Sequence, residues 1–406
     1  MNRINLKHGL ALGVGLLLIV LLGCEKFDNP PAVFNPNEQG RPSPVITGVE
    51  PAGAAFAGLT EVKLIGDNFS PVLEENVVYF GNKPGEVKSA SKTEIKVIPP
   101  KLIADALTIK VVVAGALGIA QFSPYKLKDV SSEYGNFGNL DQVYAIALDA
   151  NENLYAHLKA GSVVVKVSPA GAKTEFGKAS FPQALEMHIG PGGYLYLHRS
   201  LGNLFRIGPG GGDAQLFSTL PVRTATFDFD ANGNILAAGN KSGIYVVDPN
   251  GTPTSTGKFL AFDVKSLRVF NGFVYVLALY TGTDPSIPKS GIWRSQILSA
   301  STLGNEELVF DWSKSGDFAK AKFFAMTFSQ DGEIYVGTNN ADAILLIRPD
   351  GSSQALYKGL INPDATHLVW GNGDFLYQNR GSDKPENRRV IRIDMGKKGA
   401  PYYGRK

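Results

Sequence analysis

The stretch TATFDFDANGNILA (residues 224–237) decides the fold, because the chain repeats its pattern five more times. Each copy contains an apolar run, a turn rich in Asp, Asn or Gly, and a second short apolar run. Runs of this kind around Asn, Asp and Gly turns are typical of antiparallel β-hairpins. The other copies are YAIALDANENLYA (144–156), ALEMHIGPGGYLYL (184–197), SLRVFNGFVYV (266–276), FAMTFSQDGEIYV (324–336) and THLVWGNGDFLYQ (366–378).

One position near the end of each copy marks the period of the repeat. It is occupied by Tyr155, Tyr196, Leu236, Tyr275, Tyr335 and Tyr377. The successive steps are 41, 40, 39, 60 and 42 residues, and a third apolar run follows every copy. A period near 40 with about four short strands is typical of propeller blades. We therefore predict a six-bladed β-propeller over residues 130–406.

The repeat geometry and turn chemistry resemble those of the NHL-type and related six-bladed propellers. A propeller ring closes when one terminus supplies a strand to the blade that the other terminus begins. Residues 131–137 and residues 401–405 both suit this role, and the sequence leaves the choice open. The fourth repeat exceeds the common period by about 20 residues, which indicates either a functional loop or tolerated surface variation.

A second all-β domain is predicted ahead of the repeats, over residues 43–128. Short alternating apolar runs separated by turn residues favour a small antiparallel β-sandwich there. The stretches PVITGVEPAG, TEVKLIGDNFS, VVYFGNKPGEV, SKTEIKVIPP and LTIKVVV occur in this order between residues 44 and 113. Together they resemble the IPT/TIG family of immunoglobulin-like domains, which implies a spacer or interaction module. The predicted fold class is thus all-β, an IPT/TIG-like sandwich followed by a propeller.

The start of the chain predicts export and lipid anchoring. An apolar, uncharged run at residues 9–22 follows Arg3 and Lys7 and ends at Cys24, the only cysteine. The run is short for a membrane span but suits a signal peptide. It resembles the lipobox of bacterial lipoproteins, which implies cleavage of residues 1–23 and acylation of Cys24. An uncleaved anchor helix is the alternative. Proline-rich residues 24–42 predict a flexible tether.

Composition excludes several other classes of site. Forty Lys and Arg against 37 Asp and Glu give a net charge of +3, so no basic excess indicates nucleic-acid binding. A single cysteine can form neither an internal disulfide nor a four-cysteine metal site. Asp228, Asp230 and Asn232 match the opening of a calcium loop, but Gly239 stands where an EF-hand needs Glu. We predict hairpin turns without a cofactor, and a surface calcium ion is the alternative.

Two histidines occupy equivalent places in adjacent repeats. His157 and His198 each lie two residues past the repeat tyrosine, whereas Gly337 and Asn379 hold that place in the last two repeats. A propeller lyase or hydrolase would need such histidines close to one substrate. Packing between blades is the alternative. Residues that enter the first strands are mostly basic or neutral, which gives little support to a metal-dependent lactonase of the gluconolactonase kind.

Loops that enter the first strand, or join the second strand to the third, usually meet the ligand of a propeller. At these places the chain carries planar hydrogen-bonding and basic side chains, which suit a glycan or an anionic group. Most glycosidases need paired carboxylates instead. The predicted ligand-binding residues are His157, His198, Arg199, Arg223, Asn240, Tyr280, Lys322, Asn339, Asn340, Asn379 and Arg380.

The domain order resembles that of surface lipoproteins of Bacteroidota, some of which capture polysaccharides beside outer-membrane importers. This resemblance implies a lipid-anchored protein of the cell envelope, at the outer membrane and facing the cell surface. It implies binding of a glycan or another polar ligand without turnover, with an importer complex as partner. Two alternatives stay open: a propeller lyase or hydrolase that uses His157 and His198, and a scaffold for protein interactions.

Overall fold

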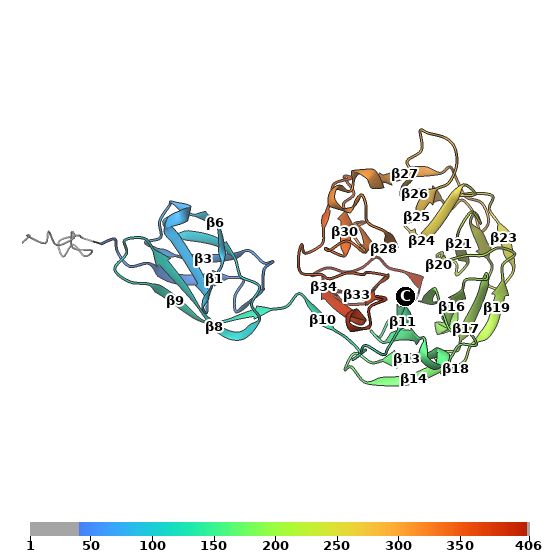
Figure 1. Ribbon diagram of the computed structural model, residues 1–406, viewed down its shortest axis with the longest axis horizontal. Helices are drawn as coiled ribbons and strands as arrows, with labels where there is room; N and C mark the ends of the chain where they lie inside the picture. Colours follow the sequence, from blue (N-terminus) through green and yellow to red (C-terminus); the bar gives the residue numbers. More distant parts are fainter. Residues whose placement is uncertain (1–39, 404–406) are drawn as a thin grey trace, which may run out of the picture.

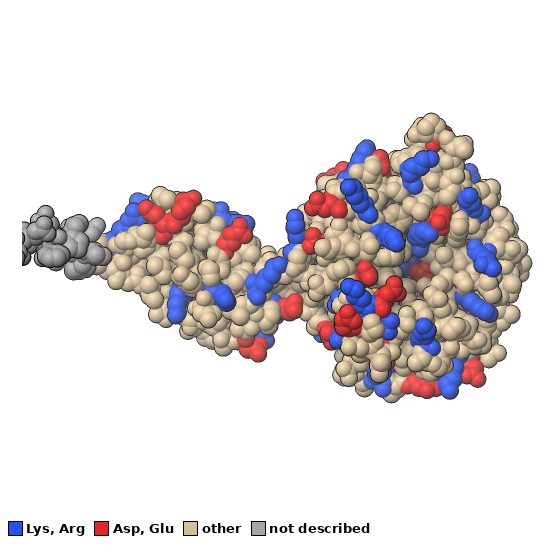
Figure 2. Space-filling model, viewed as in Figure 1, with Lys and Arg blue, Asp and Glu red and all other residues tan. Residues whose placement is uncertain are grey.

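The computed structural model describes residues 40–403, which form two all-β domains joined at one edge (Figure 1). The predictions for the signal peptide, for Cys24 and for most of the tether lie outside the described residues. At the end of the tether, Arg41 forms an isolated parallel β-bridge with Ala116 of the first domain. Within residues 40–403, no helix has the length and apolar character that crossing a membrane requires. Lys, Arg, Asp and Glu are interspersed on the visible face of both domains (Figure 2).

The first domain is a sandwich of two sheets, as predicted. One sheet has the order β1 (Val45–Glu50), β3 (Val62–Asp67), β7 (Glu94–Ile98) and β6 (Glu86–Ala90). The other has the order β2 (Ala54–Phe56), β9 (Ala120–Lys128), β8 (Ala104–Val113), β4 (Asn76–Phe80) and β5 (Lys83–Pro84). Strands β3 and β7 bury alternate residues, so the apolar face of each sheet meets the other sheet.

The second domain is a ring of six blades around an axis (Figure 1). Each blade pairs its strands in antiparallel order from the axis outward. Blade one has β11 (Val143–Leu148), β12 (Leu154–Leu158), β13 (Val163–Val167) and β14 (Lys173–Lys178), with β18 (Gly212–Asp213) added in parallel. Blade two has β15 (Glu186–Ile189), β16 (Leu195–Arg199), β17 (Asn203–Ile207) and β19 (Gln215–Thr219). Blade three has β20 (Thr226–Phe229), β21 (Ile235–Ala238), β22 (Tyr245–Val247) and β23 (Pro253–Ser255).

The remaining blades repeat this arrangement. Blade four has β24 (Phe262–Phe270), β25 (Phe273–Tyr280), β26 (Ser290–Gln296) and β27 (Glu307–Asp311), and the long loop between β25 and β26 contains part of the predicted insertion. Blade five has β28 (Phe323–Phe328), β29 (Ile334–Thr338), β30 (Ile344–Ile347) and β31 (Ser353–Ala355). Blade six has β32 (His367–Trp370), β33 (Phe375–Arg380), β34 (Arg389–Asp394) and β10 (Ser131–Glu133).

Strand β10 closes the ring, which resolves the choice that the sequence left open. It pairs antiparallel with β34, so that Ser131 faces Ile393. The outermost strand of blade six therefore comes from the start of the domain, and its other three strands come from the end. The described part of the other segment, residues 401–403, contains no strand and follows a different course.

The hairpin turns use the Asp, Asn and Gly residues as predicted. Asp230 Oδ1 accepts hydrogen bonds from the backbone N–H of Asn232 at 2.8 Å and of Asn234 at 2.9 Å. The second oxygen accepts one from Asn234 Nδ2 at 2.7 Å, and Gly233 adopts a φ of 84°. The turn thus occupies both oxygens of Asp230. Calcium binding at this place stays an untested alternative.

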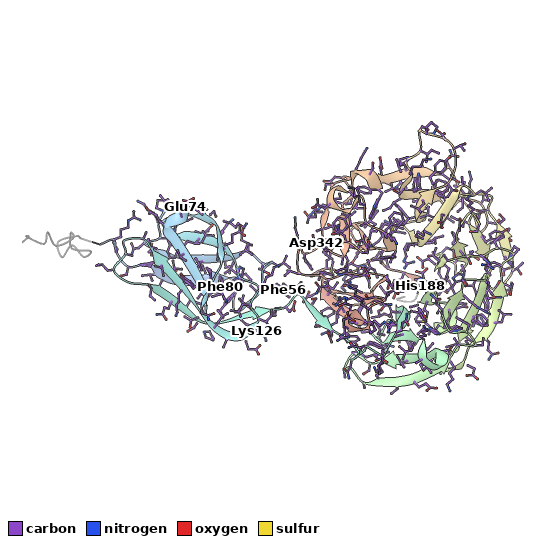
Figure 3. The ribbon with its side chains drawn as sticks, in the orientation of Figure 1. Phe56, Glu74, Phe80, Lys126, His188 and Asp342 are labelled. Atoms are coloured by element: carbon purple, nitrogen blue, oxygen red, sulfur yellow. The ribbon has the colours of Figure 1, made fainter. Side chains whose placement is uncertain are left out.

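The two domains share one hydrophobic cluster. Phe56 and Leu59 of the first domain pack against a cluster that contains Leu356 and Ile361 of the propeller. Lys101 Nζ adds a hydrogen bond of 2.8 Å to the Gly359 carbonyl. Figure 3 places Phe56 at the end of the first domain that faces the propeller. These contacts hold the first domain against the side of the ring.

Candidate functional site

Charged side chains line the axis on three of the inner strands. Glu186 and His188 lie on β15, Asp228 lies on β20 and Arg268 lies on β24, and all four are buried. Alternate residues of a strand share one face, so Glu186 and His188 point the same way. The His188 ring meets Phe227 of blade three edge-on, with ring centroids 4.9 Å apart. Inner strands thus direct polar groups toward the next blade.

A buried ion pair joins blade four to blade two. Arg268 Nη1 lies 2.6 Å from Glu186 Oε1, and His188 Nε2 lies 3.3 Å from the same oxygen. Glu186 Oε2 accepts hydrogen bonds from the Thr226 hydroxyl and from the Phe227 backbone N–H, both in blade three. Burial would raise the pKa of Glu186, but Arg268 and the bond from His188 outweigh it and hold that pKa well below its usual range.

Asp228 makes a similar link between blades three and four. Its Oδ2 accepts a hydrogen bond of 2.8 Å from the Val269 backbone N–H, and its Oδ1 accepts one from Phe229. The hydroxyl of Thr226 accepts a bond of 3.0 Å from the Leu267 backbone N–H. Because both carboxylates bond to fixed backbone groups, they connect the blades rather than point into solvent.

The last described residues, 400–403, cover one end of the axis (Figure 1). Ala400 N–H donates to the Phe328 carbonyl at 2.9 Å. Tyr402 Oη donates to the Leu148 carbonyl at 2.9 Å, and the Tyr403 ring packs on Phe229. These contacts are made with blades five, one and three at the far ends of their inner strands. The segment therefore crosses the face opposite to the one where those strands begin.

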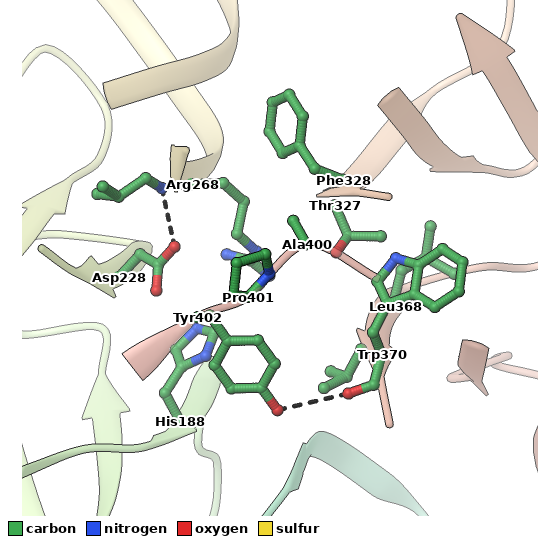
Figure 4. A pocket seen from close by; sticks show the side chains of 12 residues that line it. His188, Asp228, Arg268, Thr327, Phe328, Leu368, Trp370, Ala400, Pro401 and Tyr402 are labelled. Carbon is green, nitrogen blue, oxygen red and sulfur yellow. Dashed lines mark hydrogen bonds between the residues drawn. The ribbon is translucent and has the colours of Figure 1, made fainter. Parts of the chain in front are cut away.

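A small cavity lies at the axis, beneath the C-terminal segment (Figure 4). On the blade-six side, His367 Nε2 lies 2.8 Å from the Leu185 carbonyl of blade two. The space left between the side chains is about 30 Å³, which is room for about one water molecule. Its polar lining comes from His188, Asp228, Arg268, Thr327 and Tyr402. A sugar does not fit in this cavity.

His157 and His198 are buried between blades. The His157 ring stacks on Phe181 at a centroid distance of 6.0 Å, and His198 Nε2 lies 2.6 Å from Thr224 Oγ1. Burial lowers the pKa of each histidine to about 4. Phe181 and Thr224 precede the inner strands of the next blades. Each histidine therefore packs one blade on the following blade, which is the structural alternative considered for them.

Several other predicted ligand-binding residues are engaged within the protein. Asn379 is buried and donates from Nδ2 to the Val143 carbonyl across the ring closure at 3.0 Å. Arg380 Nε donates to the Pro363 carbonyl at 2.8 Å. Asn339 Oδ1 accepts a bond from the Lys322 backbone N–H. These contacts shape the loops where inner strands begin.

The other predicted residues lie on the same face of the ring, because each stands before a first strand or after a second strand. Arg223, Asn240 and Lys322 are exposed. Arg199 lies 6.0 Å from the Phe181 ring centroid, and the Tyr280 ring packs on Phe262 at 5.3 Å. The structure places all eleven on this face, yet it does not gather them into the axial cavity. A ligand-binding role for them stays a prediction.

Sequence reasoning missed the charged residues at the axis. A signal was present, because Glu186, Asp228 and Arg268 interrupt otherwise apolar first strands. Acidic metal ligands were expected at positions that enter these strands, whereas Glu186 and Asp228 lie inside them. No group of three His, Cys, Asp or Glu side chains that could hold a metal ion occurs within residues 40–403.

Comparison with known proteins supports both halves of the fold. Residues 44–128 match the family model of the IPT/TIG domain, so the first domain is an IPT/TIG domain as its sequence indicated. No curated protein matches the chain. An auxiliary nutrient binding protein from Bacteroides thetaiotaomicron has 13% sequence identity and a TM-score of 0.51, with 89% of this chain and 98% of that chain covered.

Two further Bacteroides structures are similar. A protein named as a phosphatase, also from Bacteroides thetaiotaomicron, has 12% identity and a TM-score of 0.55, with 88% of this chain and 99% of that chain covered. An auxiliary nutrient binding protein from Bacteroides ovatus has 14% identity and a TM-score of 0.47, with 89% and 99% covered. The resemblance to proteins of Bacteroidota is confirmed at the level of the fold.

Proposed function

We propose that this chain is a lipid-anchored protein of the cell envelope that binds a nutrient, preferably a glycan, without turning it over. The observation that carries this proposal is the small volume of the axial cavity. Propeller enzymes need a substrate beside their acid, base or metal groups, and here those groups surround about 30 Å³. The likeness in fold to an auxiliary nutrient binding protein supports the same function.

The state of the histidines supports binding over catalysis. His157 and His198 are enclosed between blades, and a pKa of about 4 keeps both neutral at physiological pH. A general acid or base must reach its substrate within hydrogen-bond distance. Neither ring is exposed to do so. The lyase or hydrolase alternative would require a substrate to open the contacts with Phe181 and Thr224.

The arrangement of the domains supports anchoring at one end and binding at the other. The described chain enters the first domain at the end away from the propeller (Figure 1). A tether that starts at an acylated Cys24 would therefore place the propeller outward from the membrane. We propose the face where the inner strands begin as the ligand-binding face, since the C-terminal segment covers the opposite one. An outer-membrane importer is the partner that this placement would serve.

Affinity electrophoresis tests the binding function. The soluble chain from residue 25 onward is run through gels that contain pullulan, xyloglucan, polygalacturonate or chondroitin sulfate, with and without EDTA. We expect at least one polysaccharide to retard the protein, equally in both conditions, without release of smaller products. Unchanged mobility in every gel would overturn glycan binding, and release of products would favour the enzyme instead.

Replacement of Cys24 by alanine tests the anchor. Two or three acyl chains give stable membrane attachment, whereas the described residues contain no membrane-spanning helix. We expect the full-length wild type to incorporate labelled palmitate and to fractionate with membranes, and Cys24→Ala to lose the label completely. Equal labelling of the two proteins would exclude Cys24 as the modified residue.

A further inference from the structure

A cleft of about 660 Å³ lies between the first domain and blade five. Leu59 lines it from the first domain. The connection from blade four to blade five lines it with Lys314 and with the residues of η5 (Gly316–Phe318). Asp342 and Tyr357 of blade five complete the polar and aromatic parts of the lining. Figure 3 places Asp342 on the propeller edge that faces the first domain.

The cleft is preformed because the domains are held together beside it. Leu59 is part of the cleft and also packs against the cluster that contains Leu356 and Ile361. The bond from Lys101 to the Gly359 carbonyl lies next to Lys358, another lining residue. Ligand pockets occur preferentially at domain interfaces, and a fixed cleft loses little entropy when it binds.

The lining combines an apolar floor with polar groups that have no partner. Leu59, Ala355 and the Tyr357 ring supply apolar surface, and Phe318 and Leu345 are buried beneath it. Lys314, Asp317 and Lys358 are exposed, and none of these side chains forms an ion pair or hydrogen bond with another described residue. Two ammonium donors and a carboxylate acceptor are thus available at one cleft.

Asn340 holds two of the cleft residues in place. Its Nδ2 donates to the Asp317 carbonyl at 2.9 Å, and its Oδ1 accepts a bond from the Asp342 backbone N–H at 3.0 Å. Asp342 Oδ1 in turn accepts a bond of 2.6 Å from the Gly359 backbone N–H. Asn340 was predicted to contact a ligand, which stays a prediction, and its contacts within the protein give it a positioning role at this cleft.

We propose that this interdomain cleft is the glycan-binding site and that it takes an uncharged segment of a sugar chain. The inference rests on the proposed function and adds its location and ligand class. Sugar hydroxyls both donate and accept hydrogen bonds, and sugar rings have apolar C–H faces, so they match unpaired donors and acceptors beside an apolar floor. Two lysines against two aspartates leave the cleft nearly neutral, which favours an uncharged ligand.

Lysine variants of the soluble chain test the location. Lys314→Ala/Lys358→Ala removes both free donors of the cleft. Lys320→Ala/Lys398→Ala is the matched control, because it removes the same charge from exposed lysines that neither line the cleft nor belong to the predicted ligand-binding residues. With pullulan and xyloglucan in the gel, we expect the cleft variant to bind at least tenfold more weakly and the control to stay within twofold of the wild type. Thermal unfolding verifies that both variants fold.

The outcomes separate this inference from the proposed function. Loss of binding in the control variant, with the cleft variant unchanged, would overturn the cleft as the site and leave glycan binding standing. Retardation by polygalacturonate or chondroitin sulfate alone would overturn the uncharged ligand. Retardation of the wild type by none of the four polysaccharides would overturn the proposed function and this inference together.

Discussion

The axis of the propeller and the interdomain cleft use charged residues in opposite ways. At the axis, Glu186 and Arg268 are buried, paired and bonded to neighbouring blades around a cavity of about 30 Å³. In the cleft, Lys314 and Lys358 are exposed and unpaired beside about 660 Å³ of open space. A charge that is paired inside the fold links neighbouring blades, whereas an unpaired charge beside apolar surface is available to a ligand.

The largest expected effect comes from breaking the ion pair at the axis. Glu186→Ala leaves Arg268 buried without its partner, which typically costs about 3–5 kcal/mol of unfolding free energy. Glu307→Ala is the control, because its pair with Arg294 is half exposed and such pairs contribute about 0–1 kcal/mol. Urea unfolding of the whole protein measures the loss of unfolding free energy in both variants. Equal losses in the two variants would contradict the difference between buried and exposed charge.

A decrease in pH is expected to destabilise the fold through its buried histidines. His157 and His198 have a pKa of about 4 in the fold, against about 6.5 in an unfolded chain. Below pH 6.5 the unfolded state therefore binds more protons, and stability falls as pH decreases toward 4. Between pH 7 and 5.5 we expect a loss of about 1 kcal/mol for each histidine. The lowered pKa of Glu186 adds its own loss only in more acidic solution.

Thermal unfolding at a series of pH values measures this dependence. His157→Leu and His198→Leu each remove one titrating ring while they keep an apolar side chain at the site. Each variant should show a shallower decline of the melting temperature between pH 7 and 5.5. Parallel curves for the wild type and both variants would show that these rings do not titrate differently on unfolding.

The smallest expected effect concerns the segment that covers the far end of the axis. Tyr402→Phe removes the hydrogen bond from Tyr402 Oη to the Leu148 carbonyl and keeps the ring. One such bond contributes about 1 kcal/mol. We expect a small decrease in unfolding free energy and no change in polysaccharide retardation, because the cleft lies elsewhere. Weaker binding in this variant would link the covered face to the ligand.

Much of the fold follows from local sequence. The Asp-Asn-Gly turns, the short apolar runs and their period near 40 predict hairpins and blades because turn chemistry acts over a few residues. The residues predicted for ligand binding were placed on one face correctly, since strand order alone assigns each loop to a face. The hydrogen-bond partners of these residues within the protein could not be predicted from the sequence. Asn379, for example, bonds to Val143 only because the ring brings the two ends of the propeller together.

The two all-β domains, the IPT/TIG character of the first and the repeat of the second could all be predicted from the order of residues. Three features became visible in the folded protein alone. Strand β10 closes the ring, and Arg268 pairs with Glu186 across the axis. Leu59 faces blade five over a cleft. The physical reason is the separation along the chain of the residues that interact. Strands and turns depend on neighbouring residues, whereas ring closure, buried ion pairs and domain interfaces join residues that only packing brings together.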